Sequence, residues 1–187
     1  MKKLLSWVAG CCILLSCNNN KPAETTIESS KDTVPGTSSR DTKQAEFADA
    51  RYVEMGKKTL GLFAAGDIDG WMNGFADTAM FRWSSGDSLA GKAAITRFWK
   101  ERRTKVIDSI QTSNDIWIPI RVNTPQQGPD IPGVWLLNWH QVNVKYKNGK
   151  RLMFWVHIDM HYNSDDKIDQ IIQYIDRAPI NKALGIQ

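Results

Sequence analysis

Two long strands near the C-terminus, joined by a tight turn, commit the second half of this chain to an antiparallel sheet. Residues 134–146 and 151–163 are each predicted to form a strand, and Asn148-Gly149 lies at the centre of the segment between them. Asn-Gly between two strand-forming segments is the strongest short-range signal for a β-hairpin. Strands are also predicted over residues 109–122 and 168–176, so the hairpin belongs to a larger sheet.

The first half of the same region is expected to be mainly helical. Residues 45–65 repeat apolar or small side chains at helical spacing and are followed by Gly66, which favours a helix end there. Asp67 is placed to cap a short second helix, and a third helix begins after Gly91. A short strand over residues 79–83 separates these two helices. The expected fold class is therefore α+β, with three N-terminal helices packed on a curved, mainly antiparallel sheet.

The N-terminus has the layout of a lipoprotein signal peptide. Lys2 and Lys3 precede an apolar run over residues 4–15, which is shorter than the ~20 residues that a membrane-spanning helix needs. The run ends just before Cys17, in a sequence that resembles a lipobox, where the cysteine receives diacylglycerol. We therefore predict a signal peptide over residues 1–16 and lipidation of the cysteine. The alternatives are an ordinary secretory signal with an incidental cysteine, and a membrane-spanning anchor.

The segment after the signal peptide is predicted to be a tether. Residues 17–44 start with the lipidated cysteine and are rich in Asn, Ser, Thr, Lys and Pro. They have too few large apolar side chains to offset the entropy of ordering, which predicts disorder. Asn18, which is not an aspartate, resembles the sorting signal for the outer membrane. We expect a bacterial envelope protein held in the outer membrane by acyl chains such as palmitate.

Cysteine content and charge exclude several classes for the remaining domain, which is predicted to be single and to span residues 45–187. No cysteine follows Cys17, so the domain has neither a disulfide nor a thiolate metal site. The net charge of +4 falls when Lys2 and Lys3 are removed with the signal peptide. The remaining charge of about +2 is too small and too evenly spread to indicate nucleic-acid binding.

Short motifs at both ends of this domain carry a family resemblance. Residues 64–71, 75–77 and 89–95 read AAGDIDGW, FAD and LAGKAAI, and residues 159–162 and 174–176 read DMHY and YID. Together they resemble the NTF2-like superfamily, which includes the SnoaL-like proteins and the ketosteroid isomerases. The resemblance implies a cone-shaped fold with a conical cavity between the helices and the concave face of the sheet. It does not specify an activity, because this fold hosts enzymes and binding domains alike.

The resemblance also implies which side chains of the strand over residues 151–163 line that cavity. Side chains alternate along a strand, so the strand has a polar and an apolar face. The polar set is Met153, Trp155, His157, Asp159 and His161, and the apolar set is Leu152, Phe154, Val156, Ile158 and Met160. The position of Asp159 faces the cavity in the isomerases, so the polar set is expected inside. The apolar set then covers the convex face, which predicts a homodimer through that face.

Catalysis is the second possibility for the polar set. In the isomerases a tyrosine and a protonated aspartate form the oxyanion hole, and a carboxylate is the base. Carried over to this chain, the aspartate is Asp159, but the tyrosine position is Thr59 and the base position is Trp83. Steroid isomerisation is therefore excluded, since a neutral carboxyl that donates a hydrogen bond cannot also abstract the proton. Asp159 with His157 or His161 stays a candidate acid–base couple for SnoaL-like cyclase, isomerase or dehydratase chemistry.

The same three residues form a His-x-Asp-x-His pattern, which raises the question of a metal site. Residues four apart on a strand lie ~13 Å apart, so His157 and His161 cannot bind one ion together. We expect no metal and no other cofactor.

The predicted pocket has aromatic walls and a few polar groups, which suits a small ligand. Its expected lining is Tyr52, Met55, Thr59, Trp83, Trp139, Trp155, His157, Asp159, His161 and Gln173. The leading hypothesis is a lipid-anchored domain that binds a small, partly apolar molecule without turning it over. The alternatives are the enzyme described above and a module that binds another protein of the envelope.

Overall fold

The computed structural model describes residues 43–125 and 130–186. The predicted signal peptide, Cys17 and nearly all of the tether lie outside these residues. No helix among the described residues is long and apolar enough to cross a membrane.

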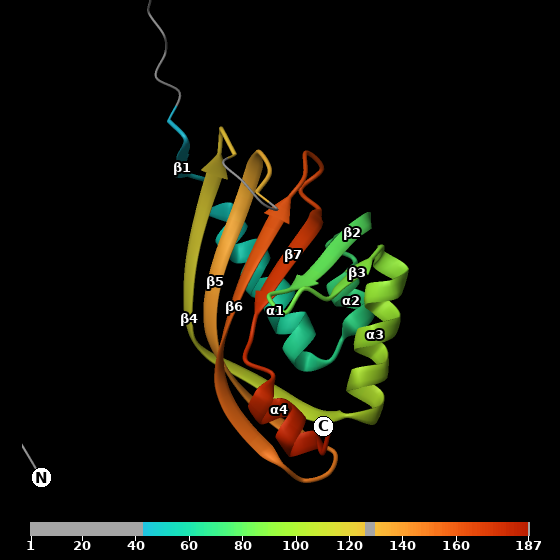
Figure 1. The fold of residues 1–187 in the computed structure, drawn as a ribbon. Helices are drawn as coiled ribbons and strands as arrows, with labels where there is room; N and C mark the ends of the chain where they lie inside the picture. Colours follow the sequence, from blue (N-terminus) through green and yellow to red (C-terminus); the bar gives the residue numbers. More distant parts are fainter. Residues whose placement is uncertain (1–42, 126–129, 187) are drawn as a thin grey trace, which may run out of the picture. The chain divides into compact units, whose positions relative to one another are not determined.

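Seven strands and four helices make up the described part of the chain (Figure 1). The strands are β1 (Ala45–Phe47), β2 (Phe75–Trp83), β3 (Ser88–Ala90), β4 (Ile107–Val122), β5 (Gly133–Tyr146), β6 (Arg151–Tyr162) and β7 (Ile168–Tyr174). The helices are α1 (Arg51–Ala65), α2 (Ile68–Met72), α3 (Lys92–Lys105) and α4 (Ala178–Leu184). The strands form one sheet in the order β1-β4-β5-β6-β7-β2-β3. Neighbouring strands are antiparallel, except that β2 runs parallel to β7.

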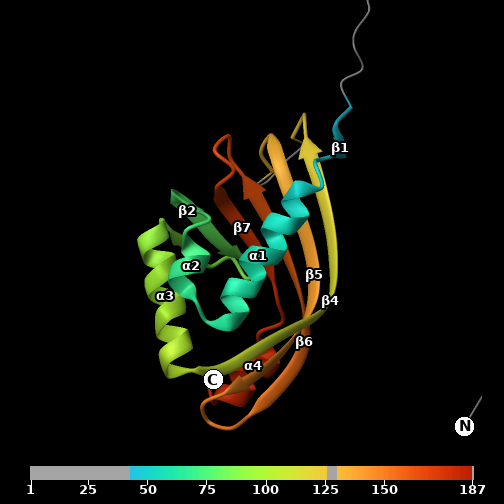
Figure 2. The ribbon, with the colours of Figure 1, turned by 180° about the vertical axis from the view of Figure 1, so that it is seen from behind.

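The helices α1, α2 and α3 lie on one face of the curved sheet, as the two opposite views show (Figures 1 and 2). We call this face the inner face and the opposite one the outer face. The short helix α4 follows β7 and lies beside the hairpin between β5 and β6, where Asn148 Nδ2 donates to the carbonyl oxygen of Ala183 at 2.9 Å. Gly149 of that hairpin has φ 84°, a conformation that glycine adopts without strain.

Most of the predicted elements are found, with four differences in detail. The strand predicted over residues 79–83 begins four residues earlier, at Phe75. Residues 45–47 form β1 at the edge of the sheet, paired with β4, so the first helix begins only at Arg51. The strand β3 and the C-terminal helix α4 were not predicted, and the α+β domain therefore has four helices where three were expected. The start of α2 agrees with the prediction, because the Asp67 side chain accepts a hydrogen bond from the backbone N–H of Gly70 at 2.8 Å.

Three aromatic side chains, one from each of the first three helices, meet above the inner face. Phe63 of α1 lies with its ring centroid 4.8 Å from that of Trp99 of α3 and 5.0 Å from that of Trp71 of α2. Rings at these separations and tilts pack favourably against one another. The three helices are thus joined to the sheet through one aromatic cluster.

The predicted facing of β6 is wrong. Phe154, Val156, Ile158 and Met160 face the helices and line the space beneath them. The alternate side chains lie on the outer face, where Met153 and Trp155 are 63% and 51% exposed. The aromatic cluster of the helices needs an apolar surface opposite it, and of the two faces of β6 only the apolar set extends that surface. The homodimer was predicted because the apolar set of β6 was expected on the convex face. That set lies on the inner face, so the homodimer loses its argument and stays a prediction.

Two glycines of α1 provide a test of this packing. Gly56 is buried, and a Cβ added there would lie 2.3 Å from Leu136 Cδ2 and 2.7 Å from Trp117 Cζ3. We expect Gly56→Ala to lower the free energy of unfolding by about 1–3 kcal/mol through overpacking, measured by urea denaturation. Gly61 of the same helix is exposed and has no atom within 4 Å of such a Cβ. Gly61→Ala should raise stability by about 0.5–1 kcal/mol. Equal effects of the two substitutions would contradict the described packing of α1.

Candidate functional site

A hollow lies between the aromatic cluster and the inner face of the sheet. Its deep part has two connected sections of about 90 Å³ and about 40 Å³, which share Leu60, Phe63, Trp99, Ile158 and Gln173 as walls. A wider mouth of about 380 Å³ lies next to it, and Trp99 and Gln173 also line this mouth. The walls of the deep part are mainly apolar, so it can accept a short aliphatic chain or a small ring.

Asn138 and His140 of β5 are the two polar side chains buried deepest on the inner face. They are two residues apart on one strand, so they face the same way, and His140 Nδ1 lies 2.6 Å from Asn138 Oδ1. Asn138 Nδ2 donates to the carbonyl oxygen of Ile116 at 3.1 Å, which turns Oδ1 towards the imidazole. We therefore assign the Nδ1–H tautomer to His140, since a carbonyl oxygen can only accept.

Burial lowers the pKa of His140 from its ordinary value to about 4. The imidazole is therefore neutral at physiological pH, and its Nε2 makes no hydrogen bond with any described residue. Because His140 lines the larger deep section, this nitrogen offers a hydrogen-bond acceptor to a ligand there.

Two donors complement this acceptor. The indole Nε1 of Trp99 is buried and has no hydrogen-bond partner among the described residues. Gln173 accepts a hydrogen bond from Trp83 Nε1 through its Oε1 at 2.8 Å, which leaves its amide NH₂ available. Trp99 and Gln173 border both deep sections and the mouth. The hollow therefore combines apolar walls with polar groups of Trp99, His140 and Gln173 that can pair with a ligand.

The polar set of β6, predicted to line the cavity, lies on the outer face instead. Asp159 Oδ1 is 2.8 Å from His157 Nε2, so these two side chains are in contact. The His157 ring is stacked between Trp139, at 4.2 Å between centroids, and Tyr174, at 5.2 Å. Burial raises the pKa of Asp159, and the neighbouring imidazole opposes that rise. This couple could exchange a proton, but it faces away from the hollow.

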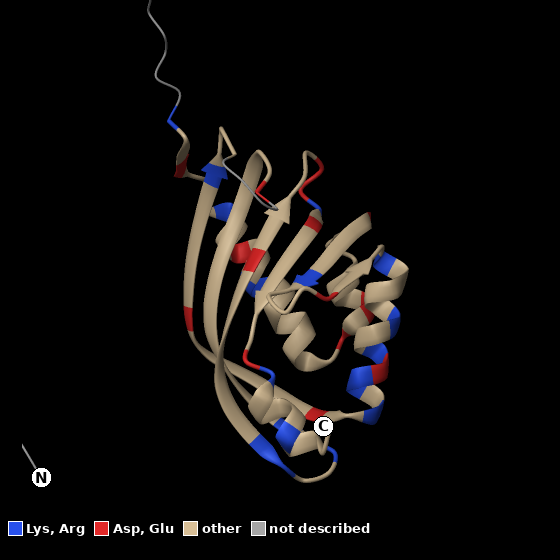
Figure 3. Ribbon diagram, viewed as in Figure 1, with Lys and Arg blue, Asp and Glu red and all other residues tan. Residues whose placement is uncertain are grey.

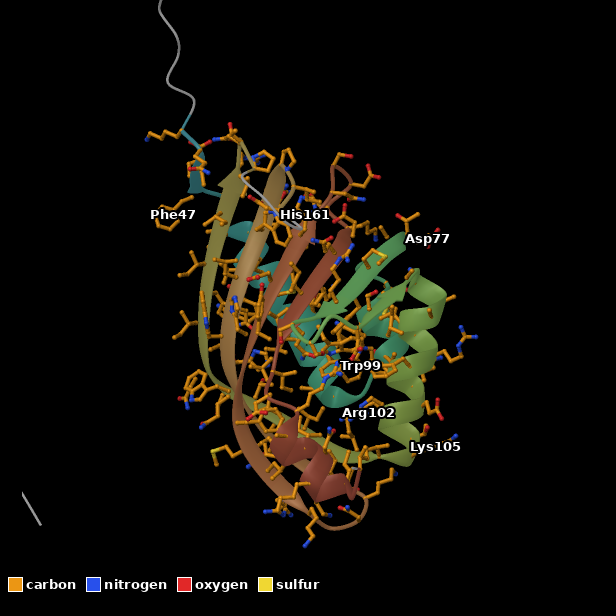
Figure 4. All side chains as sticks on the ribbon, in the orientation of Figure 1. Phe47, Asp77, Trp99, Arg102, Lys105 and His161 are labelled. Carbon is orange, nitrogen blue, oxygen red and sulfur yellow. The ribbon has the colours of Figure 1, made fainter. Side chains whose placement is uncertain are left out.

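His161 does not belong to this couple. The side chain, labelled in Figure 4, is buried near the end of β6. Its Nδ1 lies 2.5 Å from Asp169 Oδ1, and its Nε2 lies 3.1 Å from the carbonyl oxygen of Pro132. Its ring also packs against Trp135. The predicted row of three polar residues is thus divided between two separate hydrogen-bonded groups.

The other predicted pocket residues divide between the hollow, the core and the outer face. Thr59 lines the smaller deep section, and Trp83 and Gln173 line the mouth. Tyr52 is a core residue whose hydroxyl donates to Asp166 at 2.8 Å, and Met55 packs against the same core. Trp139 and Trp155 are on the outer face, as their register on β5 and β6 requires.

Sequence reasoning missed Asn138, His140 and Trp99. Asn138 and His140 flank Trp139, which was expected to face the cavity, and the sequence left the facing of His140 open. The sequence did contain a signal for Asn138 and His140. They lie at every second position of β5 between Leu136 and Val142, two apolar residues on the same buried face. No group of three His, Cys, Asp or Glu side chains spaced to hold a metal ion occurs within residues 43–125 and 130–186.

Comparison with known proteins gives similarity at the level of structure. No family model matches the sequence, and a search of curated proteins found no match. An NTF2-like protein of unknown function from Burkholderia pseudomallei matches 70% of this chain and 95% of its own, with a TM-score of 0.56 and 12% identity. A protein with a ketosteroid isomerase-like fold from Catenulispora acidiphila, in complex with trimethylamine, matches 72% of this chain and 94% of its own. The TM-score of that match is 0.52, at 8% identity.

A third similar structure is an LEH-like epoxide hydrolase from M. tuberculosis. It covers 71% of this chain and 87% of its own, with a TM-score of 0.51 and 13% identity. Identities this low carry no information about which residues act, so the comparison concerns the backbone arrangement alone.

The buried imidazole predicts a specific pH dependence of stability. The pKa of His140 is about 4 in the folded chain and about 6.5 when unfolded, so its contribution is fully present above pH 6.5 and is lost as the pH falls towards 4. Between pH 7 and pH 5 this loss is about 2 kcal/mol. His140→Gln should remove that part of the pH dependence, measured by urea unfolding at both pH values.

The wall variant Val142→Ala is the control, because it creates a cavity without changing a titratable group. It should lower stability by about the same amount at pH 7 and at pH 5. If the stability of His140→Gln fell with pH as steeply as that of the wild type, the described burial of this imidazole would be wrong.

Proposed function

Because this chain has the NTF2-like fold, we propose that it binds a small, mainly apolar molecule in the hollow between the helices and the sheet. The observation that carries the proposal is the combination of apolar walls with the buried indole Nε1 of Trp99, which has no hydrogen-bond partner among the described residues, beside the imidazole of His140 and the amide of Gln173. A buried polar atom without a partner is costly to the folded state, and a ligand that pairs with it offsets that cost.

The size of the hollow limits the ligand. Pockets for drug-sized molecules have volumes of about 300–1,000 Å³. The larger deep section has about 90 Å³, whereas the mouth has about 380 Å³. A short chain or ring therefore fits the deep part, and any bulkier or more polar part of the ligand occupies the mouth.

Binding without turnover is favoured over catalysis by the chemistry of the walls. No carboxylate of the described residues borders either deep section, and the imidazole of His140 there is a weak base because burial lowers its pKa to about 4. The catalytic alternative keeps one observation in its favour, the contact between His157 and Asp159. Any reaction at that couple would take place on the outer face and would not use the hollow.

The alternative function, binding of another envelope protein, is supported by a different observation. Met153, Trp155 and Tyr174 are exposed on the outer face, and Ile116 of β4 is exposed beside them. A second protein, or a second copy of this chain, would cover these side chains. We place this below ligand binding, because a surface of this kind does not explain the unpaired atoms inside the hollow.

We further propose that the domain is held at a bacterial outer membrane by lipid on Cys17. The support is the order of basic residues, apolar run and lipobox in the sequence. In cells labelled with palmitate, the wild-type chain should incorporate label and Cys17→Ser should not. Cys12→Ser removes a cysteine from the signal peptide itself and should leave labelling intact. Labelling of Cys17→Ser would exclude this anchor.

Ligand binding itself is tested with octanol as an apolar probe with one hydroxyl. Isothermal titration calorimetry of the purified full chain in amphipol should show saturable binding. Val142→Phe narrows the larger deep section, so it should weaken binding by more than about ten-fold, or 1.4 kcal/mol.

Met153→Phe adds an aromatic ring on the outer face and is the matched control, with binding unchanged. Circular dichroism of both variants should retain the spectrum and the cooperative unfolding of the wild type. If octanol fails to bind, or binds Val142→Phe as tightly as the wild type, the hollow is not the binding site.

A further inference from the structure

The mouth of the hollow carries an excess of positive charge. Arg102 of α3 and Arg177, just before α4, are its two basic residues, and Asp87 is its one acidic residue. Within residues 43–125 and 130–186, no charged side chain forms a wall of the deep sections. The positive charge therefore lies at the entrance of an otherwise apolar cavity.

Only one of the two arginines has a carboxylate partner. Arg177 forms an ion pair with Asp87 and lies over the ring of Trp83, with Cζ 5.0 Å from the centroid. The guanidinium of Arg177 is therefore already neutralised and held in place. Asp87 Oδ2, the oxygen that pairs with Arg177, also accepts a hydrogen bond from the Ser85 hydroxyl.

Arg102 has no such partner. Its guanidinium forms no hydrogen bond or ion pair with any described residue, and its nearest aromatic contact is Phe98, with Cζ 5.6 Å from the centroid. α3 is rich in Lys and Arg (Figure 3), but Arg102 lies on the side of the helix that Trp99 shares and faces the sheet (Figure 4). Burial lowers the pKa of Arg102, which indicates that water solvates this charge less than an exposed one.

A partly buried, unpaired guanidinium next to an apolar cavity favours a ligand that has an anionic group at one end and an apolar group at the other. Its planar fork matches a carboxylate in two parallel hydrogen bonds, which are stronger than neutral ones. The mouth and the larger deep section share Trp99, Gln173, Ile175 and Ile180 as walls, so a group bound at Arg102 lies next to the apolar section.

We propose that the ligand of this cavity is a small amphiphile with a carboxylate, whose anionic end binds Arg102 and whose apolar end fills the hollow. This inference rests on the proposed function and adds the class of ligand to it. The charge at Arg102 then provides selectivity for acids over uncharged molecules of the same length.

The test compares octanoate with octanol on the purified full chain in amphipol, by isothermal titration calorimetry. Octanoate should bind more tightly than octanol by about ten-fold or more, because a hydrogen bond to a charged group is worth more than a neutral one. Arg102→Gln should weaken octanoate binding by a similar factor and change octanol binding little. Arg97→Gln removes the same charge from the exposed side of α3 and should retain both affinities.

The outcomes separate this inference from the function on which it rests. If both probes bind equally well and Arg102→Gln changes the two affinities by the same factor, the proposed selectivity for acids is wrong but binding in the hollow stands. If neither probe binds, both proposals are wrong. Competition of inorganic phosphate with octanoate at equal affinity would show a site for free anions, and would overturn the amphiphile.

Discussion

The structure depends on the packing of three aromatic rings, the buried Trp71 and Trp99 and the partly buried Phe63, which the first three helices direct towards the sheet. Burying a large apolar side chain contributes about 1.5–3 kcal/mol. That gain requires an apolar surface opposite the rings, which Ile158 and Met160 provide. Had β6 presented its polar face instead, each unpaired carboxylate or imidazole would have cost about 1–3 kcal/mol or more. The choice of face therefore follows from the core and places Asp159 outside.

The sequence predicts the spans of the elements far better than their faces. The Asn148-Gly149 hairpin and the Asp67 cap are set by local backbone chemistry, and both are found where expected. The three-residue strand β1 is not a local preference, because it exists only through pairing with β4. The facing of β6 was taken from a family resemblance at Asp159. The apolar side chains at every second position from 152 to 160 favour the opposite facing, with the apolar set towards the helices. Packing decided the matter, and the resemblance stayed correct at the level of the fold.

The candidate site could be predicted from the sequence only in part, for the same reason. Gln173 and Thr59 came from the resemblance and do border the hollow. Asn138 and His140 could not be chosen without knowing the face of β5, since their neighbour Trp139 is an equally plausible pocket residue. The unpaired state of Arg102 is beyond any pattern in the sequence, because it depends on Asp87 having paired with Arg177 across 90 residues of chain.

The last helix shapes the cavity without belonging to the sheet. Ile180 of α4 borders both the mouth and the larger deep section, and a side-chain hydrogen bond from Asn148 to Ala183 ties this helix to the hairpin. Helix α4 takes no part in strand pairing, so a substitution on it alters these walls while the hydrogen bonds between strands remain. The selectivity of the cavity and the stability of the sheet can therefore be changed by different substitutions.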